Sequence, residues 1–279
     1  MIPANTKEEL RVFLDRKVAE YNRPSFIPDD PVSVPHRYSK KQDIEIAGFF
    51  AAIFSWGNRR TIIQKTQTLL RLMDNAPYQF VRHHTDNDLK KLLDFKHRTF
   101  NATDLLYFIA FLQQHYAAWD SLEDAFLLPW EKRGEPAVTG YARTGSFEQP
   151  GGFDAAAALS AFHHYFFSLP DYPPRTRKHI ATPEKNSSCK RINMFLRWMV
   201  RTDDKGVDFG LWSRIPASHL ICPLDVHVAR VAKRFGLLNR ERSDWQAAVD
   251  LTRYLAILDK EDPVKYDFAL FGLGVMEKF

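Results

Sequence analysis

The sequence predicts an all-α protein built from two helical lobes. Apolar residues recur at helical spacing along nearly the whole chain, whereas strand-like alternation bounded by turn signals is hard to find. With 279 residues, of which 45% are hydrophobic and 14% aromatic, the chain is long and apolar enough to build a substantial core. Together these observations favour a packed helical fold over a disordered chain.

The helical segments follow from this periodicity in chain order. The expected helices span residues 7–21, 43–55, 59–74, 87–94, 102–117, 153–168, 190–201, 225–235, 244–258 and 263–271. Two of the starts carry a capping signal. Ser243 followed by Gln246 fits a capping box, and Asp262 before Pro263 places a cap beside a first-turn proline.

One stretch divides the chain. Residues 128–152 are rich in Gly and Pro and lack helical periodicity, so we expect a long loop there. The loop would join a lobe of residues 1–127 to a lobe of residues 153–279 within a single domain.

Charge and cysteine usage narrow the class of protein. The net charge of +5 is a small excess, but Lys and Arg clearly outnumber acids in the stretch 171–201, which favours a basic surface there. Cys189 and Cys222 are the only cysteines and form no CxxC pair, so neither a disulfide framework nor an iron–sulfur or zinc site is supported. Because no stretch has the apolar length of a membrane span or a signal sequence, we expect a soluble cytoplasmic protein.

The expected helix at 190–201 has two different faces. Its apolar stripe consists of Ile192, Phe195, Leu196, Met199 and Val200. Lys190, Arg197 and Arg201 are separated by nearly whole helical turns and share another stripe, which we expect to meet phosphates. Lys190 also falls in the first turn, where the helix dipole and Arg191 disfavour an ammonium. It is therefore a candidate nucleophile, although a solvated surface lysine is the simpler interpretation.

The next helix begins at an acid. Asp225 precedes an apolar stripe, and basic residues lie on the other side of the same helix. Capping the first turn would by itself explain Asp225, because a carboxylate accepts hydrogen bonds from the amides there. The same amides would keep the carboxylate ionised, so that it could also face a developing cation.

Both segments resemble the helix-hairpin-helix (HhH-GPD) DNA glycosylase superfamily, which includes endonuclease III and the archaeal 8-oxoguanine glycosylases. The stretch "PLDVHVARVAKRFGL" is similar to the segment that bears the catalytic aspartate of that superfamily, which places Asp225 at this position. The stretch "SSCKRINMFL" is similar to the end of its hairpin, where bifunctional members carry a nucleophilic lysine, here Lys190. The resemblance implies a two-lobed helical fold with a cleft between the lobes, and because the cysteine count supports no metal cluster we expect no cofactor.

The chain also resembles an uncharacterised bacterial family of that superfamily, common in Bacteroidetes. This resemblance is carried by "DPVSVPHRYSKKQDIEIAGFFAAIFSWGNRR", "FKHRTFNATDLLYF" and "DPVKYDFALFGLGV". The sequence also departs from the superfamily. The Gly-rich hairpin that cradles a DNA phosphate corresponds here to "ATPEKNSSC", which contains no glycine, and the four-cysteine cluster of endonuclease III is absent.

The resemblance implies DNA base excision repair on a damaged base that is flipped out of the duplex. Lys190 would attack C1′ and form a Schiff base that can lead to strand cleavage (AP lyase activity), while Asp225 would stabilise the positive charge on the sugar or help to deprotonate the lysine. The candidate stacking residues are Phe49, Trp56, Phe153 and Trp212. The candidate DNA-backbone contacts are Arg175, Arg177, Lys178, Arg191, Arg197 and Arg230.

Three other functions compete with this hypothesis. A metal-dependent hydrolase would need converging ligands, but the adjacent histidines at 83–84 and 163–164 point about 100° apart on a helix, and no metal-binding motif is present. The main rival is a non-catalytic member of the fold that binds nucleic acid or a protein. The third is a helical scaffold that binds no nucleic acid. The sequence carries no signal of oligomeric state or of the base that is recognised.

Overall fold

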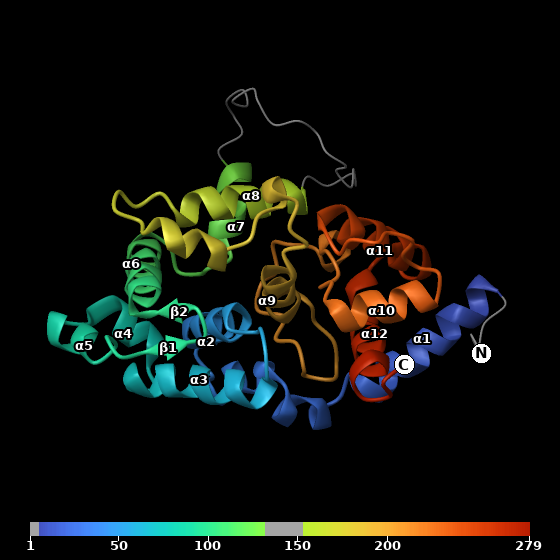
Figure 1. Ribbon diagram of the computed structural model, residues 1–279, viewed down its shortest axis with the longest axis horizontal. Helices are drawn as coiled ribbons and strands as arrows, with labels where there is room; N and C mark the ends of the chain where they lie inside the picture. The colour runs from blue at the N-terminus through green and yellow to red at the C-terminus, as the bar shows by residue number, and fades with distance from the viewer. Residues whose placement is uncertain (1–5, 132–152) are drawn as a thin grey trace. The chain divides into compact units, whose positions relative to one another are not determined.

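The computed structural model describes residues 6–131 and 153–279 and is mostly helical (Figure 1). The described residues form two compact units, and each unit combines segments that are distant in the sequence. Unit 1 contains residues 6–26, 153–156 and 182–279, and unit 2 contains residues 27–131 and 157–181.

The described part of unit 1 contains five longer helices and three short 3-10 turns. Its helices are α1 (Lys7–Tyr21), α9 (Lys190–Val200), α10 (Val226–Arg234), α11 (Trp245–Leu258) and α12 (Tyr266–Val275), and its 3-10 turns are η5 (Pro183–Lys185), η6 (Ala217–His219) and η7 (Pro263–Lys265). Helix α12 packs against both α1 and α10 (Figure 1). Glycines permit this close approach: a Cβ at Gly272 would lie 2.2 Å from the Tyr21 ring, and one at Gly274 would lie 3.0 Å from His227.

Unit 2 is built around an aromatic core. Its helices are α2 (Lys41–Ile53), α3 (Arg59–Leu72), α4 (Pro77–His83), α5 (Asp86–Lys90), α6 (Ala102–Ala118), α7 (Asp124–Glu131) and α8 (Ala155–Phe166), whose first two residues fall in unit 1, and its 3-10 turns include η2 (Pro31–Ser33), η3 (Pro35–Arg37) and η4 (Pro174–His179). The turn η1 (Pro24–Asp29) spans the boundary between the units. A short antiparallel hairpin, β1 (Lys96–His97) and β2 (Phe100–Asn101), precedes α6.

The buried carboxylate of Glu45 links three segments of unit 2 by hydrogen bonds. The carboxylate of Glu45 on α2 accepts hydrogen bonds from the Tyr116 hydroxyl at 2.8 Å, the Ser121 hydroxyl at 2.5 Å and the Leu122 amide at 3.0 Å. These bonds tie α2 to the end of α6 and to the segment that leads into α7. Because each donor is satisfied by the same carboxylate, the polar groups can be buried here at low cost.

The two units differ from the two predicted lobes. Helix α1 belongs with the C-terminal half of the chain because it packs on α12, and most of α8 belongs with unit 2 because Phe162 and Phe166 pack on Phe49. Of the predicted loop 128–152, residues 128–131 belong to α7 and residues 132–152 lie outside the described part of the chain.

Both predicted caps are placed differently. The N-cap of α11 is Asp244, which accepts a hydrogen bond from the amide of Ala247 at 2.9 Å, so the capping box at Ser243 is wrong by one residue. Asp262 precedes η7 but makes no side-chain cap, because its carboxylate accepts a hydrogen bond from Arg201 at 2.9 Å instead.

Candidate active site in unit 1

The hairpin that leads into α9 places Lys190 at the first position of the helix. Asn186 and Cys189 both adopt the left-handed backbone conformation, with φ of 54° and 50°. Asparagine tolerates this conformation better than most residues. The hairpin therefore makes its turns without glycine, and Cys189 is the last residue before the helix.

The Lys190 ammonium lies in a half-buried position with few partners. Its Nζ lies 3.5 Å from the sulfur of Met194, one turn further along α9. In the described part of the chain no carboxylate forms an ion pair with it. The amine is therefore not neutralised by a dedicated counter-ion.

Asp225 is the N-cap of α10, as the sequence predicted. Its Oδ1 accepts hydrogen bonds from the amides of His227 at 2.8 Å and Val228 at 2.9 Å. No hydrogen bond from the described residues reaches its Oδ2. One oxygen thus stabilises the helix while the other stays available to a further group.

The starts of α9 and α10 lie close together. The hydroxyl of Ser188, two residues before Lys190, donates a hydrogen bond at 3.4 Å to the carbonyl of Leu224, the residue before Asp225. The charges of Lys190 and Asp225 also act on one and the same buried carboxyl, that of Asp267. The structure therefore places the segment before Lys190 against the segment before Asp225.

Asp267 is the functional candidate that the sequence analysis missed. It lies in the first turn of α12, is 5% exposed, and forms an ion pair with Arg197. Burial raises the pKa of Asp267, Arg197 lowers it, Asp225 raises it and Lys190 lowers it, and the net result is a pKa of about 6. A signal was present in the sequence, because Asp267 is the only acid in an otherwise apolar helix and such an acid needs a partner.

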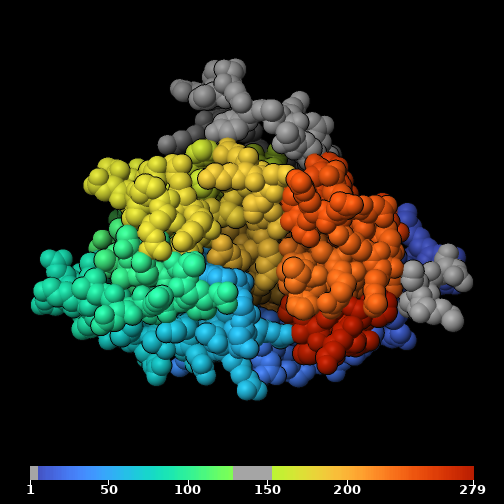
Figure 2. Space-filling view, in the orientation of Figure 1, coloured from blue at the N-terminus to red at the C-terminus, as the bar shows by residue number. Residues whose placement is uncertain are grey.

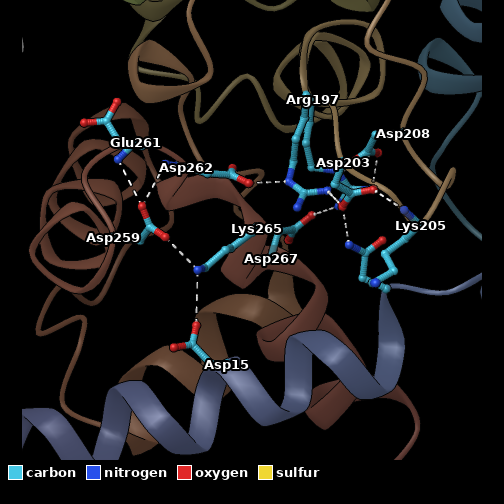
Figure 3. Close-up of polar contacts among 12 residues, drawn as sticks. Asp15, Arg197, Asp203, Lys205, Asp208, Asp259, Glu261, Asp262, Lys265 and Asp267 are labelled. Atoms are coloured by element: carbon cyan, nitrogen blue, oxygen red, sulfur yellow. Dashed lines mark hydrogen bonds and ion pairs between the residues drawn. The ribbon is translucent and has the colours of Figure 1, made fainter.

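Arg197 belongs to a buried ion-pair network and not to the surface. Its guanidinium is 5% exposed and contacts Asp208 at 3.3 Å as well as Asp267 (Figure 3). Arg201, one turn further on, contacts Asp208 at 3.2 Å and Asp262 at 2.9 Å. The prediction that the stripe through Arg197 and Arg201 meets phosphates is therefore wrong for these two arginines, because carboxylates of the same unit cover them.

The other predicted phosphate contacts have different surroundings. In unit 2, Arg175 pairs with buried Asp104 at 3.2 Å, and the exposed Arg177 donates a hydrogen bond to the Tyr172 hydroxyl at 2.6 Å. Lys178 is exposed. Arg191 is only partly exposed, and burial lowers its pKa to about 10, which leaves it cationic near neutral pH.

Helix α10 keeps a cationic outer face. Arg230 donates hydrogen bonds to the carbonyls of Phe279 at 3.0 Å and Gly274 at 2.6 Å, and it remains exposed. Lys233 and Arg234 on the same helix are exposed as well. The segment that includes α10 and α11 forms part of the surface seen in Figure 2, where it is orange.

Three of the four predicted stacking residues are buried core residues. Phe49 is 0% exposed among the phenylalanines of unit 2, and Trp212 is 1% exposed against Phe195 in unit 1, so neither can stack on a ligand as it stands. Phe153 is also buried and lies beside His219. Only Trp56 is partly exposed, and its ring contacts a histidine of unit 2 at a centroid distance of 4.8 Å.

Two features of the described residues bear on other classes of function. Across residues 6–131 and 153–279, no three or more His, Cys, Asp or Glu side chains are grouped so that they could hold a metal ion. Over the same residues, no helix has both the length and the apolar character needed to cross a membrane.

Comparison with known proteins assigns the family. A family model described as "Protein of unknown function (DUF2400)" matches residues 30–276. The chain belongs to this family. Neither a search of curated proteins nor a search of solved structures found a match. The match covers nearly all of unit 2 and most of unit 1, and the relation to DNA glycosylases stays a prediction.

Proposed function

We propose that this chain is a DNA repair glycosylase with AP lyase activity, in which Lys190 bonds to C1′ of a flipped, damaged nucleotide. The observation that supports this most is the pairing of the two helix starts. Lys190 has no ion pair in the described part of the chain, and Asp225, at the helix start that contacts the segment before Lys190, has one carboxylate oxygen without a hydrogen bond from the described residues. A nucleophile next to a fixed anion is the arrangement that such a reaction requires.

Each residue has a separate role in this proposal. The neutral amine of Lys190 attacks C1′ as the bond to the base breaks, and the resulting amine adduct opens to a Schiff base. Asp225 is held in place by two amide hydrogen bonds, so its charge needs no rearrangement to stabilise the cationic sugar. Within unit 1, Arg230 is the remaining exposed candidate for phosphate contact.

Covalent trapping tests the proposal directly. The protein is incubated with duplexes that carry 8-oxoguanine, uracil, an oxidised pyrimidine or an abasic site, and borohydride reduces any Schiff base to a stable adduct. We expect an adduct with the wild type and none with Lys190→Ala. Lys185→Ala is the matched control, because Lys185 is an exposed lysine of the same hairpin and should leave trapping intact. Trapping that survives in Lys190→Ala would refute the role of Lys190.

Two substitutions at Asp225 separate chemistry from capping. Asparagine is as good an N-cap as aspartate, so Asp225→Asn should keep the stability of α10 while it removes the charge. Asp225→Ala should remove both the N-cap and the charge, and the loss of the cap should cost about 1 kcal/mol of stability. If Asp225→Asn traps DNA as fast as the wild type, Asp225 is only a cap.

A non-catalytic member of the fold remains the alternative, and one observation favours it. The two hydrogen bonds at Oδ1 of Asp225 are a complete structural explanation of that residue. Such a protein would bind nucleic acid or a protein partner but would catalyse neither base release nor strand cleavage. DNA binding that weakens with salt, with neither base release nor trapping on any duplex, would support this alternative over the enzyme.

A further inference from the structure

Trp56 is a partly exposed tryptophan in the turn between α2 and α3 of unit 2. Its ring meets the ring of His97 edge-on, with the centroids 4.8 Å apart, and the centroid of the His179 ring lies 6.0 Å away. Both histidines are 2% exposed. Buried partners therefore hold the indole in place while part of it stays open to solvent.

The hairpin β1–β2 places a cation beside this indole. The guanidinium of Arg98 packs over Gly57, the residue after Trp56, because a Cβ at that glycine would lie 2.6 Å from Nη1 of Arg98. Gly57 also has a φ of 103°, which favours glycine. Arg98 is exposed, and in the described part of the chain no acid forms an ion pair with it. Its charge is therefore available to a ligand.

Arg175 on η4 supplies a second cation at the same hairpin. It donates a hydrogen bond at 2.9 Å to the carbonyl of Thr99, the residue after Arg98, and pairs with the buried Asp104 at 3.2 Å. Asp104 also contacts Nε2 of His179 at 3.3 Å, so the same carboxylate positions Arg175 and a histidine beside the indole. The side chain of Arg175 is still 39% exposed. Its pair with Asp104 thus fixes it without covering it.

The segments that meet around Trp56 are rich in cations. Residues 56–65, 96–101 and 174–179 contain three, two and three Lys or Arg residues, respectively, and no Asp or Glu. Burial lowers the pKa of His97, and Arg98 and Lys65 lower it as well, which places both cations near this ring. A surface of this charge attracts a polyanion.

We propose that the surface formed by Trp56, Arg98 and Arg175 binds a single strand of nucleic acid, with one base stacked on the indole and phosphates against the two guanidinium groups. An indole stacks on any base, and a guanidinium group binds phosphate through paired hydrogen bonds. An acidic peptide would account for the cations but not for the exposed indole. A duplex keeps its bases stacked on one another and offers none to Trp56. The inference concerns unit 2 alone and does not depend on the reaction proposed at Lys190.

Fluorescence anisotropy tests this surface with the full chain. The probes are labelled oligo(dT) and oligo(rU) of about 20 nucleotides, which exceeds the usual site size of such surfaces. Neither probe carries a damaged base or an abasic site, so binding requires no reaction at Lys190. We expect at least one strand to bind, with an affinity that falls as the salt concentration rises.

Substitutions separate stacking from charge. Trp56→Ala should weaken binding about 5- to 100-fold, the range for loss of one stacked base, whereas Trp56→Phe keeps a ring and most of the affinity. Arg98→Gln should reduce the slope of log affinity against log salt by about 0.7. Arg71→Gln is the matched control, because Arg71 is an exposed arginine in the last turn of α3, whereas Trp56 precedes the first. It should change neither affinity nor slope.

Four results would overturn the inference. These are no binding of either strand, binding that ignores salt, equal affinities of the wild type, Trp56→Ala and Arg98→Gln, and equally tight binding of polyglutamate that is insensitive to Trp56→Ala. If Trp56→Ala does not fold, quenching of tryptophan fluorescence by the oligonucleotide replaces it. Part of this quenching should be lost in Trp56→Phe, and quenching unchanged in that variant would refute the stack.

The two proposals of function can fail separately. Strand binding that depends on Trp56 and Arg98, in a protein that traps no DNA, would refute the proposed glycosylase and leave this surface intact. Trapping by a protein whose strand binding ignores Trp56 and Arg98 would do the reverse.

Discussion

Replacement of Arg197 by methionine removes the guanidinium that joins the buried carboxyls of Asp208 and Asp267. The side chains of Asp208 and Asp267 are 1% and 7% exposed, so solvent cannot replace the lost partner. Asp208 keeps its contact with Arg201 at 3.2 Å, whereas Asp267 has no other ion pair in the described part of the chain. Removal of one partner from a buried pair typically costs about 3–5 kcal/mol, and we expect Arg197→Met to lose this much stability at pH 8.

The loss should depend on pH in a defined direction. The native pKa of Asp267 is raised to about 6 from an ordinary value of 3.8, so its contribution to stability is complete below the ordinary value and is lost as the pH rises through 6. Because Arg197 lowers this pKa, its removal raises the pKa further. Near pH 5 the variant can protonate Asp267 and avoid an unpaired charge. The destabilisation should therefore be smaller at pH 5 than at pH 8.

Urea unfolding of the wild type and Arg197→Met at both pH values measures this difference. The control is Arg240→Met, since Arg240 forms an exposed ion pair with Asp250 and such pairs contribute about 0–1 kcal/mol. A loss below about 1 kcal/mol at pH 8, or an equal loss at pH 5, would refute the network as described. A phosphate contact at Arg197 would instead leave stability unchanged and reduce the salt slope of DNA binding by about one.

Other substitutions test packing, backbone and buried polar groups by thermal or urea unfolding. Gly272→Ala places a Cβ 2.2 Å from the Tyr21 ring and should cost about 1–3 kcal/mol; an unchanged midpoint would contradict the close packing of α1 on α12. Asn186→Gly should be neutral or slightly stabilising because φ is 54°, whereas Asn186→Val should cost roughly 1–2 kcal/mol, and equal stabilities would refute the left-handed turn. Glu45→Ala leaves three buried donors without an acceptor and should cost at least about 2 kcal/mol of stability. A smaller loss would contradict the hydrogen bonds to Glu45.

Local sequence signals determine most of the helix positions in this protein. The helix predicted at 7–21 is α1 (Lys7–Tyr21), because Thr6 and Glu9 form a capping box at its start. The expected helices at 59, 102 and 190 also begin where the structure begins them. Helix α4 was missed because its seven residues are too few to show periodicity, and the short β1–β2 hairpin was missed for the same reason.

The pairing of distant segments could not be predicted in the same way. The sequence placed Lys190 at a helix start and Asp225 at an N-cap, and both placements are confirmed. Their approach depends on Ser188 meeting Leu224, and no local pattern encodes a contact across 36 residues. The division into units likewise depends on which distant helix covers the apolar face of α1 or α8.

Arg197 shows why a polar helix stripe is an ambiguous signal. A cationic stripe opposite an apolar one predicts a surface only if nothing charged covers it, and the acids that cover Arg197 lie 11 and 70 residues away in the sequence. The same stripe begins at Lys190, which lies at the hairpin end of α9 and escapes this cover. Burial of the two arginines with their acids thus leaves Lys190 as the one cation of the stripe without an ion pair in the described part of the chain. A reactive amine requires this condition, since an ammonium held by its own carboxylate is a poor nucleophile.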